Sequence, residues 1–191
     1  KSLKHHLRGR QSDPYNLRVV YILALAYQAL EDYDELHNII SDAMEKNPDG
    51  FELHDILITQ YCIEGNWKKA RATMERLLLL RPNDNHAHRV AVDLFLFARD
   101  YNVALDHLQK MKHVPPDYKV ALAYILLKKW DRGWANTLLD EVIAQQLKRI
   151  DEKGDVWSRT RYILAEAYSV MNDKDSSLNW LEKAVDKGWT Q

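Results

Sequence analysis

Apolar side chains in this sequence follow a helical spacing, and the pattern returns along the chain. The stretch Phe51–Asp84 shows it most clearly, with two apolar-periodic segments separated by Gly65-Asn66 and closed by Pro82. Residues three and four apart share one face of a helix, so each segment predicts an amphipathic helix. Gly-Asn is typical of a turn, and a proline disfavours helix at the residue before it. The stretch therefore predicts a helix-turn-helix unit.

The landmarks of this unit return with a period of 34 residues. Four sets of residues recur with this period. The prolines are Pro14, Pro48, Pro82 and Pro116, and the two sets of aromatic residues are Tyr27, Tyr61 and Phe95 and Tyr33, Trp67 and Tyr101. The small or apolar residues are Leu36, Ala70 and Ala104. A fixed period of this length with a helix-turn-helix inside it is typical of a stacked repeat array. The predicted fold class is therefore all-α, an α-solenoid of about five repeats.

The two helices within each repeat are predicted to touch. At the expected closest positions the residues compensate in size and two bulky ones never meet, as in Ala24 with Leu36, Ile58 with Ala70, and Val92 with Ala104. Such compensation in size is what close packing at nearly constant volume requires.

The predicted organisation is an N-terminal extension or partial repeat helix at residues 1–16 and a repeat domain at residues 17–191. The repeats are predicted at residues 17–50, 51–84, 85–118, 114–150 and 158–191. Residues 1–16 are basic, with no acidic side chain before Asp13, so they suit either a nucleic-acid-binding arm or a frayed helix. We favour the frayed helix.

The fourth repeat is predicted to be degenerate. Pro115-Pro116 at its start predicts a short first helix, near residues 117–129, and Trp130 is aligned with Tyr33 of the first repeat. The second helix is predicted to run on toward Ile150, with a turn at residues 151–155.

Composition and charge give no general reason to expect nucleic acid or an anionic membrane as partner. The chain has 191 residues and a formal net charge of -1, and its acidic and basic blocks suit solvated helix faces. Cys62 is the single cysteine, which excludes a disulfide framework. The longest apolar run, Val19–Tyr27, is far shorter than the roughly 18 residues of a membrane span.

The sequence predicts no catalytic site, no cofactor and no metal site. It contains no Gly-rich phosphate loop and no nucleophile motif. His86 and His88 are two residues apart, unlike the i,i+4 pairs that bind zinc on a helix. His54 and His88 share one repeat position and are predicted to pack in the core. The turn aromatics Tyr33, Trp67, Tyr101 and Trp130 are predicted to be core residues too.

These positions resemble the tetratricopeptide repeat. The family pattern asks for Leu, a small residue and Tyr in the first helix, Gly-Asp-Tyr at the turn, Ala in the second helix and Pro at the end. The second repeat answers with Leu57, Tyr61, Gly65-Asn66-Trp67, Ala70 and Pro82. The fifth answers with Leu164, Ala165, Tyr168, Asn172-Asp173 and Ala184, but has Lys174 for the turn aromatic and Trp189 for the final proline. The resemblance covers about residues 17–191.

The resemblance implies a right-handed superhelix whose first helices line a concave groove for a peptide or a partner helix. Mapped onto this chain, the groove residues are Arg18, Tyr21, Gln28, Glu52, Asp55, His86, Arg89, Asp93, Tyr118, Lys119, Arg159, Tyr162 and Glu166. Family members that clamp a terminal carboxylate use Lys, Asn and Arg, where this chain has Tyr21, Leu25, Thr59 and Val90. That clamp is absent.

The resemblance favours a non-enzymatic scaffold that binds a protein or peptide partner in this groove. The alternative is a sensory or regulatory segment of a larger enzyme or transcription regulator whose active domain lies outside this chain. The C-terminal part is also loosely similar to repeat segments of bacterial winged-helix regulators, on Tyr162–Tyr168 and Trp180–Ala184.

The last predicted helix, residues 174–187, places Leu178, Leu181 and Val185 along one side. Terminal repeats that stay soluble alone have a polar outer face. We therefore expect this apolar face to be covered, either by a longer native chain or by a second copy in a homodimer.

Overall fold

The computed structural model describes residue 13 and residues 16–153 and 158–189. These residues form ten helices and no strand, which confirms the predicted all-α repeat fold. The chain divides into two compact units, residues 1–99 and residues 100–191. The predicted segment 1–16 lies almost wholly outside the described residues, as does the end of the predicted turn at residues 151–155.

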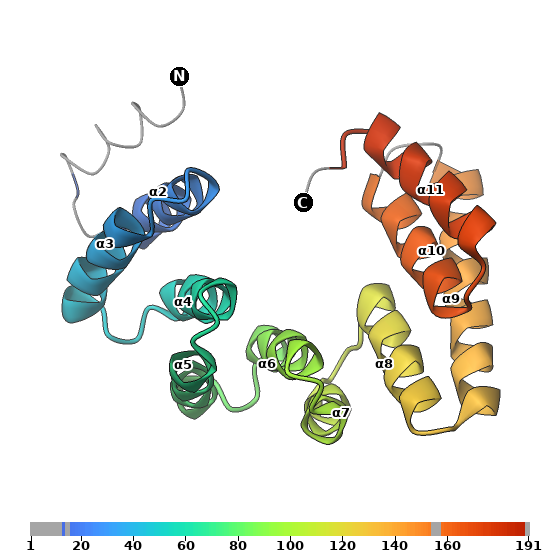
Figure 1. The fold of residues 1–191 in the computed structure, drawn as a ribbon, viewed down its shortest axis with the longest axis horizontal. Helices are drawn as coiled ribbons and strands as arrows, with labels where there is room; N and C mark the ends of the chain where they lie inside the picture. The colour runs from blue at the N-terminus through green and yellow to red at the C-terminus, as the bar shows by residue number, and fades with distance from the viewer. Residues whose placement is uncertain (1–12, 14–15, 154–157, 190–191) are drawn as a thin grey trace. The chain divides into compact units, whose positions relative to one another are not determined.

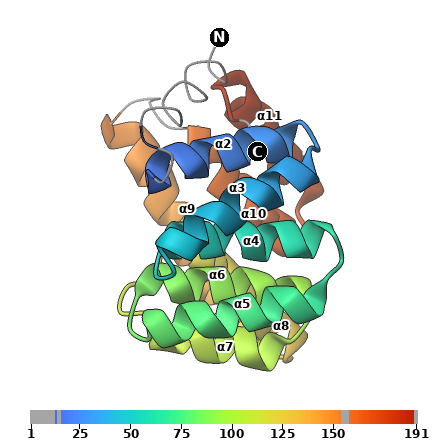
Figure 2. The ribbon, with the colours of Figure 1, turned by 90° about the vertical axis from the view of Figure 1, so that its left-hand side faces the viewer.

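The first unit consists of two complete helix pairs and one further helix. Its helices are α2 (Leu17–Ala29), α3 (Tyr33–Lys46), α4 (Phe51–Ile63), α5 (Trp67–Leu80) and α6 (Asn85–Phe97). Helix α2 packs against α3 and α4, and α4 packs in turn against α5 and α6 (Figure 1, Figure 2). The first helices of successive pairs therefore contact one another as well as their own partners.

The second unit begins with α7 (Tyr101–Lys110) and continues with two complete pairs. These are α8 (Pro116–Lys128) with α9 (Arg132–Lys153), and α10 (Ser158–Val170) with α11 (Lys174–Asp186). Helix α10 packs against α8, α9 and α11, and α7 packs against α8. The predicted long second helix is α9, which has 22 residues and passes Ile150.

The first helix of the fourth pair is not short, contrary to the expectation from Pro115-Pro116. Helix α8 has 13 residues, as do α2, α4, α6 and α10. Pro116 is its first residue. Proline suits that position because its fixed φ matches the helix and its missing N–H would have had no helical partner. The proline pair sets where α8 begins and does not shorten it.

The same local device connects the helices of each of the four pairs and also links α6 to α7 along the chain. One residue in the left-handed region follows the first helix, at Glu31, Gly65, Arg99, Trp130 and Asn172, with φ between 57° and 70°. An Asp or Asn comes next, at Asp32, Asn66, Asp100, Asp131 and Asp173, and its side chain accepts a hydrogen bond from a backbone N–H in the first turn of the second helix. The left-handed residue ends one helix and the capping side chain starts the next.

This device shows that the predicted alignment of the fourth repeat was wrong by two residues. Asp131 caps α9 through the N–H of Trp134 at 3.2 Å, as Asp32 caps α3 through the N–H of Glu35 at 3.3 Å. Trp130 is therefore equivalent to Glu31 and not to Tyr33. Trp130 matches Tyr33 in residue type, but the capping aspartate defines the position within the turn.

The predicted contact between the two helices of a pair is confirmed in both units. Ala24 and Leu36 are buried in the core of the first unit, where α2 packs on α3. With the corrected alignment, the equivalent residues of the fourth pair are Ala123 and Ala135, both fully buried in the core of the second unit. In the fifth pair the hydroxyl of Ser177 donates a hydrogen bond to the carbonyl of Ala165 at 2.9 Å.

The turn aromatics do not all lie in the core. Tyr33 and Tyr101 are partly buried, but Trp67 is 43% exposed and Trp130 is 83% exposed. Trp67 is the first residue of α5, and its ring lies 5.9 Å from that of the exposed Phe97. Trp130 is outside both of its neighbouring helices, so neither helix face covers it.

The two histidines predicted to pack in the core, His54 and His88, are both buried. Nδ1 of His54 lies 3.0 Å from the carbonyl oxygen of Gly50, one helical turn earlier. Burial lowers the pKa of His54, because an apolar environment disfavours the charged imidazolium. The neutral ring is therefore a structural residue of α4.

Candidate functional site

A groove opens between α4 and α6 in the first unit. It has a volume of about 190 Å³, and its lining residues are Asp55, Ile58, Thr59, Cys62, Ile63, Val90, Asp93, Leu94 and Phe97. Most of these side chains are apolar, and each helix contributes one carboxylate. The groove therefore combines an apolar floor with two negative charges.

One of these carboxylates already binds a side chain of the same unit. Oδ2 of Asp55 lies 3.1 Å from Nε2 of His86, which is the second residue of α6. This hydrogen bond raises the pKa of His86, although burial opposes the change. Burial also raises the pKa of the Cys62 thiol, which makes it a poor nucleophile and a suitable apolar wall of the groove.

A chain of polar side chains crosses the first unit beside the groove. Nε2 of Gln28 donates to Oε1 of Gln60 at 3.1 Å, and Nε2 of Gln60 donates to Glu64 at 2.9 Å. Glu64 also lies 2.7 Å from Nε2 of His37. Burial alone would raise the pKa of Glu64, but the hydrogen bonds from Gln60 and His37 outweigh it and lower the pKa. Gln28, a predicted groove residue, thus serves to join α2 to α4.

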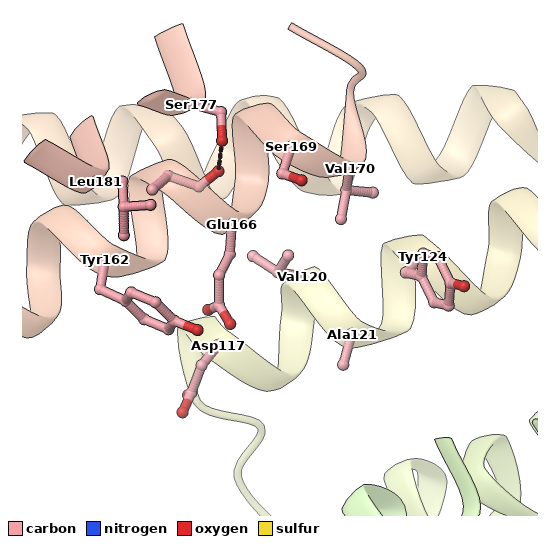
Figure 3. A pocket seen from close by; sticks show the side chains of 11 residues that line it. Asp117, Val120, Ala121, Tyr124, Tyr162, Glu166, Ser169, Val170, Ser177 and Leu181 are labelled. Carbon is pink, nitrogen blue, oxygen red and sulfur yellow. Dashed lines mark hydrogen bonds between the residues drawn. The ribbon is translucent and has the colours of Figure 1, made fainter. Parts of the chain in front are cut away.

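A larger pocket of about 360 Å³ opens between α8 and α10 in the second unit. Apolar walls come from Val120, Ala121, Ala165, Val170 and Leu181, and polar groups from Asp117, Tyr124, Tyr162, Glu166, Ser169 and Ser177. In Figure 3 the Glu166 side chain extends from α10 toward α8, close to Tyr162 and Asp117, while Tyr124 stands at the other end. Like the α4–α6 groove, the pocket combines two carboxylates with apolar walls.

Neighbouring side chains hold this pocket in shape. Arg159, the second residue of α10, forms an ion pair with Asp117 of α8. The ring of Tyr162 stacks on Trp189, with ring centres 4.5 Å apart. The hydrogen bond from Ser177 to Ala165 fixes α11 against α10 behind the pocket. The ion pair therefore joins the starts of α8 and α10, and the other two contacts hold α10 against the C-terminal segment.

Comparison with solved structures shows which fold carries these two sites. The chain resembles TTC0263, a thermophilic TPR protein in Thermus thermophilus, with a TM-score of 0.64 and 20% identity over 90% of this chain and 91% of that one. It resembles PilF of Pseudomonas aeruginosa with a TM-score of 0.63 and 12% identity over 92% of this chain and 78% of that one. YrrB, a TPR protein with an unusual peptide-binding site, gives a TM-score of 0.54 and 13% identity over 98% of this chain and 94% of that one.

The fold is that of the tetratricopeptide repeat (TPR). No family model matches the sequence, and no curated protein does. The resemblance seen in the sequence is thus supported by the fold.

The structure brings only some of the predicted TPR groove residues together. Asp55 and Asp93 line the α4–α6 groove, with His86 beside them, and Tyr162 and Glu166 line the α8–α10 pocket with Arg159 beside them. The remaining predicted residues line neither site: Arg18, Tyr21, Gln28, Glu52, Arg89, Tyr118 and Lys119. Glu52 instead lies in a separate hollow that also includes Phe51 and Arg81.

Tyr118 differs most from its expected role, because it is only 7% exposed. Arg18, Glu52, His86 and Arg159 are each the second residue of their helix, and the second residue of α8 is Asp117. The two-residue error in the fourth repeat therefore placed Tyr118 and Lys119 in the groove and missed Asp117 and Tyr124. Pro116 was the signal that would have found them, since a proline at the first helical position fixes the numbering.

Two further observations concern metal ions and membranes. Among the residues that the structure describes, no group of three or more His, Cys, Asp or Glu side chains is placed to hold a metal ion. Within the same residues, every helix is too short or too polar to cross a membrane.

Proposed function

We propose that this chain is a non-enzymatic TPR scaffold that binds a peptide segment or helix of a protein partner along its first helices. The observation that carries the proposal is the recurrence of one arrangement in two units. In each unit, an apolar hollow opens between the first helices of successive pairs. In each, the ninth residue of the second of these helices is acidic, namely Asp93 and Glu166.

The side chains that line the two hollows favour a partner segment of mixed character. Apolar walls favour an apolar side chain, and the flanking carboxylates favour a neighbouring Lys or Arg. His86 and Arg159 show this preference within the chain, because each binds a lining carboxylate through a cationic or hydrogen-bond-donating group. Tyr124 and Tyr162 add aromatic surface, on which a cationic side chain also binds well. A purely acidic segment would be repelled.

A solved TPR structure is consistent with this proposal. YrrB, whose fold this chain shares, is a TPR protein with an unusual peptide-binding site. The hollows described above are of the size of one or two side chains, so a bound segment would place single residues in them as anchors. Energetically dominant anchors of this kind are common at protein interfaces.

The proposal can be tested by selecting peptides on the purified chain from a random displayed library. We expect enriched sequences that pair a bulky apolar residue with Lys or Arg. Ser169→Trp should block the α8–α10 pocket, because Ser169 lies at its mouth on α10 and is exposed. Affinity for a peptide that uses this pocket should then fall by about tenfold to a hundredfold, since fully burying one apolar side chain contributes about 1.5–3 kcal/mol.

Ser169→Ala is the matched control, because it removes the hydroxyl without filling the pocket. It should bind the selected peptides as the wild type does. The proposal would be refuted if the library yielded no enriched sequence. It would also be refuted if the selected peptides bound wild type and Ser169→Trp equally and were unaffected by Thr59→Trp in the α4–α6 groove.

A further inference from the structure

The turn between α8 and α9 carries a residue that its backbone does not favour. The five turns after the first helices each place one residue in the left-handed region. Gly65 and Asn172 suit it, whereas Glu31, Arg99 and Trp130 do not. Trp130 has φ 68° in the same place. Bulky side chains rarely adopt this conformation, because Cβ comes too close to the backbone. Fold stability therefore does not explain a tryptophan here.

Burial does not explain Trp130 either. The residue is 83% exposed, and four residues further on Trp134 is 55% exposed. Single exposed apolar residues are ordinary on protein surfaces. Two exposed indoles within five residues, one of them held in an unfavourable backbone conformation, suggest that the turn contacts something outside the chain.

The charge around these indoles is positive. Lys128, Lys129 and Arg132 flank Trp130 in the sequence. The segment Lys128–Trp134 contains one acidic residue, Asp131. The carboxylate of Asp131 is engaged in capping α9. Lys129 donates to Asn102 of α7 at 2.6 Å, and Lys128 lies over the ring of Tyr124 at 5.1 Å, so neither lysine is paired with a carboxylate in these contacts. Neither of these contacts neutralises the positive charge of its lysine.

We propose that the α8–α9 turn docks on an anionic phospholipid membrane surface, with Trp130 and Trp134 entering the headgroup region and the three cations binding lipid phosphates and carboxylates. Indoles favour the membrane–water interface because they combine an apolar ring with an N–H donor. Basic residues beside them add attraction to an anionic leaflet. The chain would lie on the surface without entering further, since no described helix can cross a membrane.

The shape of the turn favours a lipid surface over a protein or a nucleic acid. Both tryptophans are exposed and neither lines any of the hollows described above, so the turn offers no pocket for an anchor from a partner. A soft, laterally mobile surface accepts protruding indoles without a preformed pocket. This inference concerns the C-terminal end of α8, whereas Asp117 of the proposed peptide site is at its N-terminal end; Lys128 lies over Tyr124 of that site.

Co-sedimentation with lipid vesicles tests the inference. We expect the wild-type chain to sediment with phosphatidylcholine vesicles that contain phosphatidylserine, and to stay in solution with phosphatidylcholine alone. Changing Lys128, Lys129 and Arg132 to Gln should weaken binding on the order of a hundredfold. Added salt should weaken it as well, because exposed charges are screened.

Trp130→Gly is the decisive variant. Glycine suits the left-handed turn, so this chain should melt at the same temperature as the wild type or higher, while vesicle binding is lost. Leu79→Ala is the matched control, since Leu79 is also 83% exposed and lies on α5, far along the chain from the turn. It should leave vesicle binding unchanged.

Three results would overturn the inference: failure of the wild type to bind phosphatidylserine vesicles, equal binding by Trp130→Gly, or equal binding to vesicles without anionic lipid. A single-stranded oligonucleotide that displaces the vesicles at lower concentration than soluble phosphoserine does would assign the turn to nucleic acid instead and would equally refute it.

Discussion

Nε2 of His86 lies 3.1 Å from Oδ2 of Asp55, which ties the first turn of α6 to α4 beside the α4–α6 groove. The two residues are 31 positions apart, so this contact forms only when successive repeats stack. It connects the stability of the stack to the charge at a candidate binding site.

The stability of this contact should depend on pH. The hydrogen bond to Asp55 raises the pKa of His86 above its ordinary 6.5, with Arg89 opposing and Asp84 assisting. Because the folded pKa is the higher one, the stabilisation is fully present below the unfolded pKa and is lost as pH rises through the folded value. His86 is partly exposed, so we expect about 0.2–1 kcal/mol.

Urea unfolding of wild type and His86→Gln at several pH values measures this effect. The difference in unfolding free energy should be largest below about pH 6 and should fall to zero as the pH rises past the raised pKa of His86. Asp55→Asn is the control, because without the carboxylate the low-pH stabilisation by His86 should be lost or reversed, since burial and Arg89 lower its pKa. A difference that grows with pH would contradict the assignment.

The helices and their pairing could be predicted from the sequence because repetition supplies the same evidence several times. Leu57, Ala70 and Pro82 are each weak signals, but their counterparts in other repeats point to the same helix faces. The fourth repeat differs in length from the others, so its residues do not align with theirs at the same period. There, only Pro116 and Asp131 fix the helix starts, and both act through backbone chemistry that hydrophobic periodicity does not report.

The candidate sites were less predictable, for physical reasons. The resemblance to the tetratricopeptide repeat implied which face of a first helix is open, and Asp55, Asp93, Tyr162 and Glu166 from that mapping line the two hollows. Whether an open position becomes part of a hollow depends on side-chain contacts between repeats. The ion pair of Arg159 with Asp117 is an example, because it joins residues 42 positions apart that no periodic pattern relates.

The left-handed turns predict opposite outcomes for two glycines. A Cβ added at Gly65 or at Gly133 would meet no other atom within 4 Å, but only Gly65 has a positive φ, at 70°. Gly65→Ala should therefore destabilise the chain by about 1–2 kcal/mol. Gly133→Ala, in the first turn of α9, should stabilise it by up to about 1 kcal/mol. Thermal melts of the two variants decide this, and equal effects would refute the role given to φ.

Burial predicts unequal effects at two core candidates in the first unit. Leu36 is fully buried between α2 and α3, so Leu36→Ala should destabilise by about 2–5 kcal/mol. Trp67 is only partly covered, so Trp67→Ala should stay below the roughly 3 kcal/mol of a fully buried tryptophan. Denaturant unfolding followed by circular dichroism compares them. A larger loss for Trp67→Ala would mean that its contact with Phe97 contributes more than its exposure indicates.

The outer face of α11 leads to the last prediction. Leu178, Leu181 and Val185 follow one another at helical spacing, and all three are exposed. Exposed apolar side chains that share one helix face favour association, because burying them removes apolar surface from water. The homodimer through residues 174–187 therefore stays a prediction with a direct test.

Light scattering across a concentration series should show the mass of the wild type rising toward twice the monomer, whereas Val185→Glu should remain monomeric because an unpaired carboxylate is costly to bury. Lys187→Glu is the control, since it changes charge at the end of α11 without altering the apolar face. A wild type that stays monomeric at every concentration would contradict the homodimer, and so would equal behaviour of Val185→Glu and wild type.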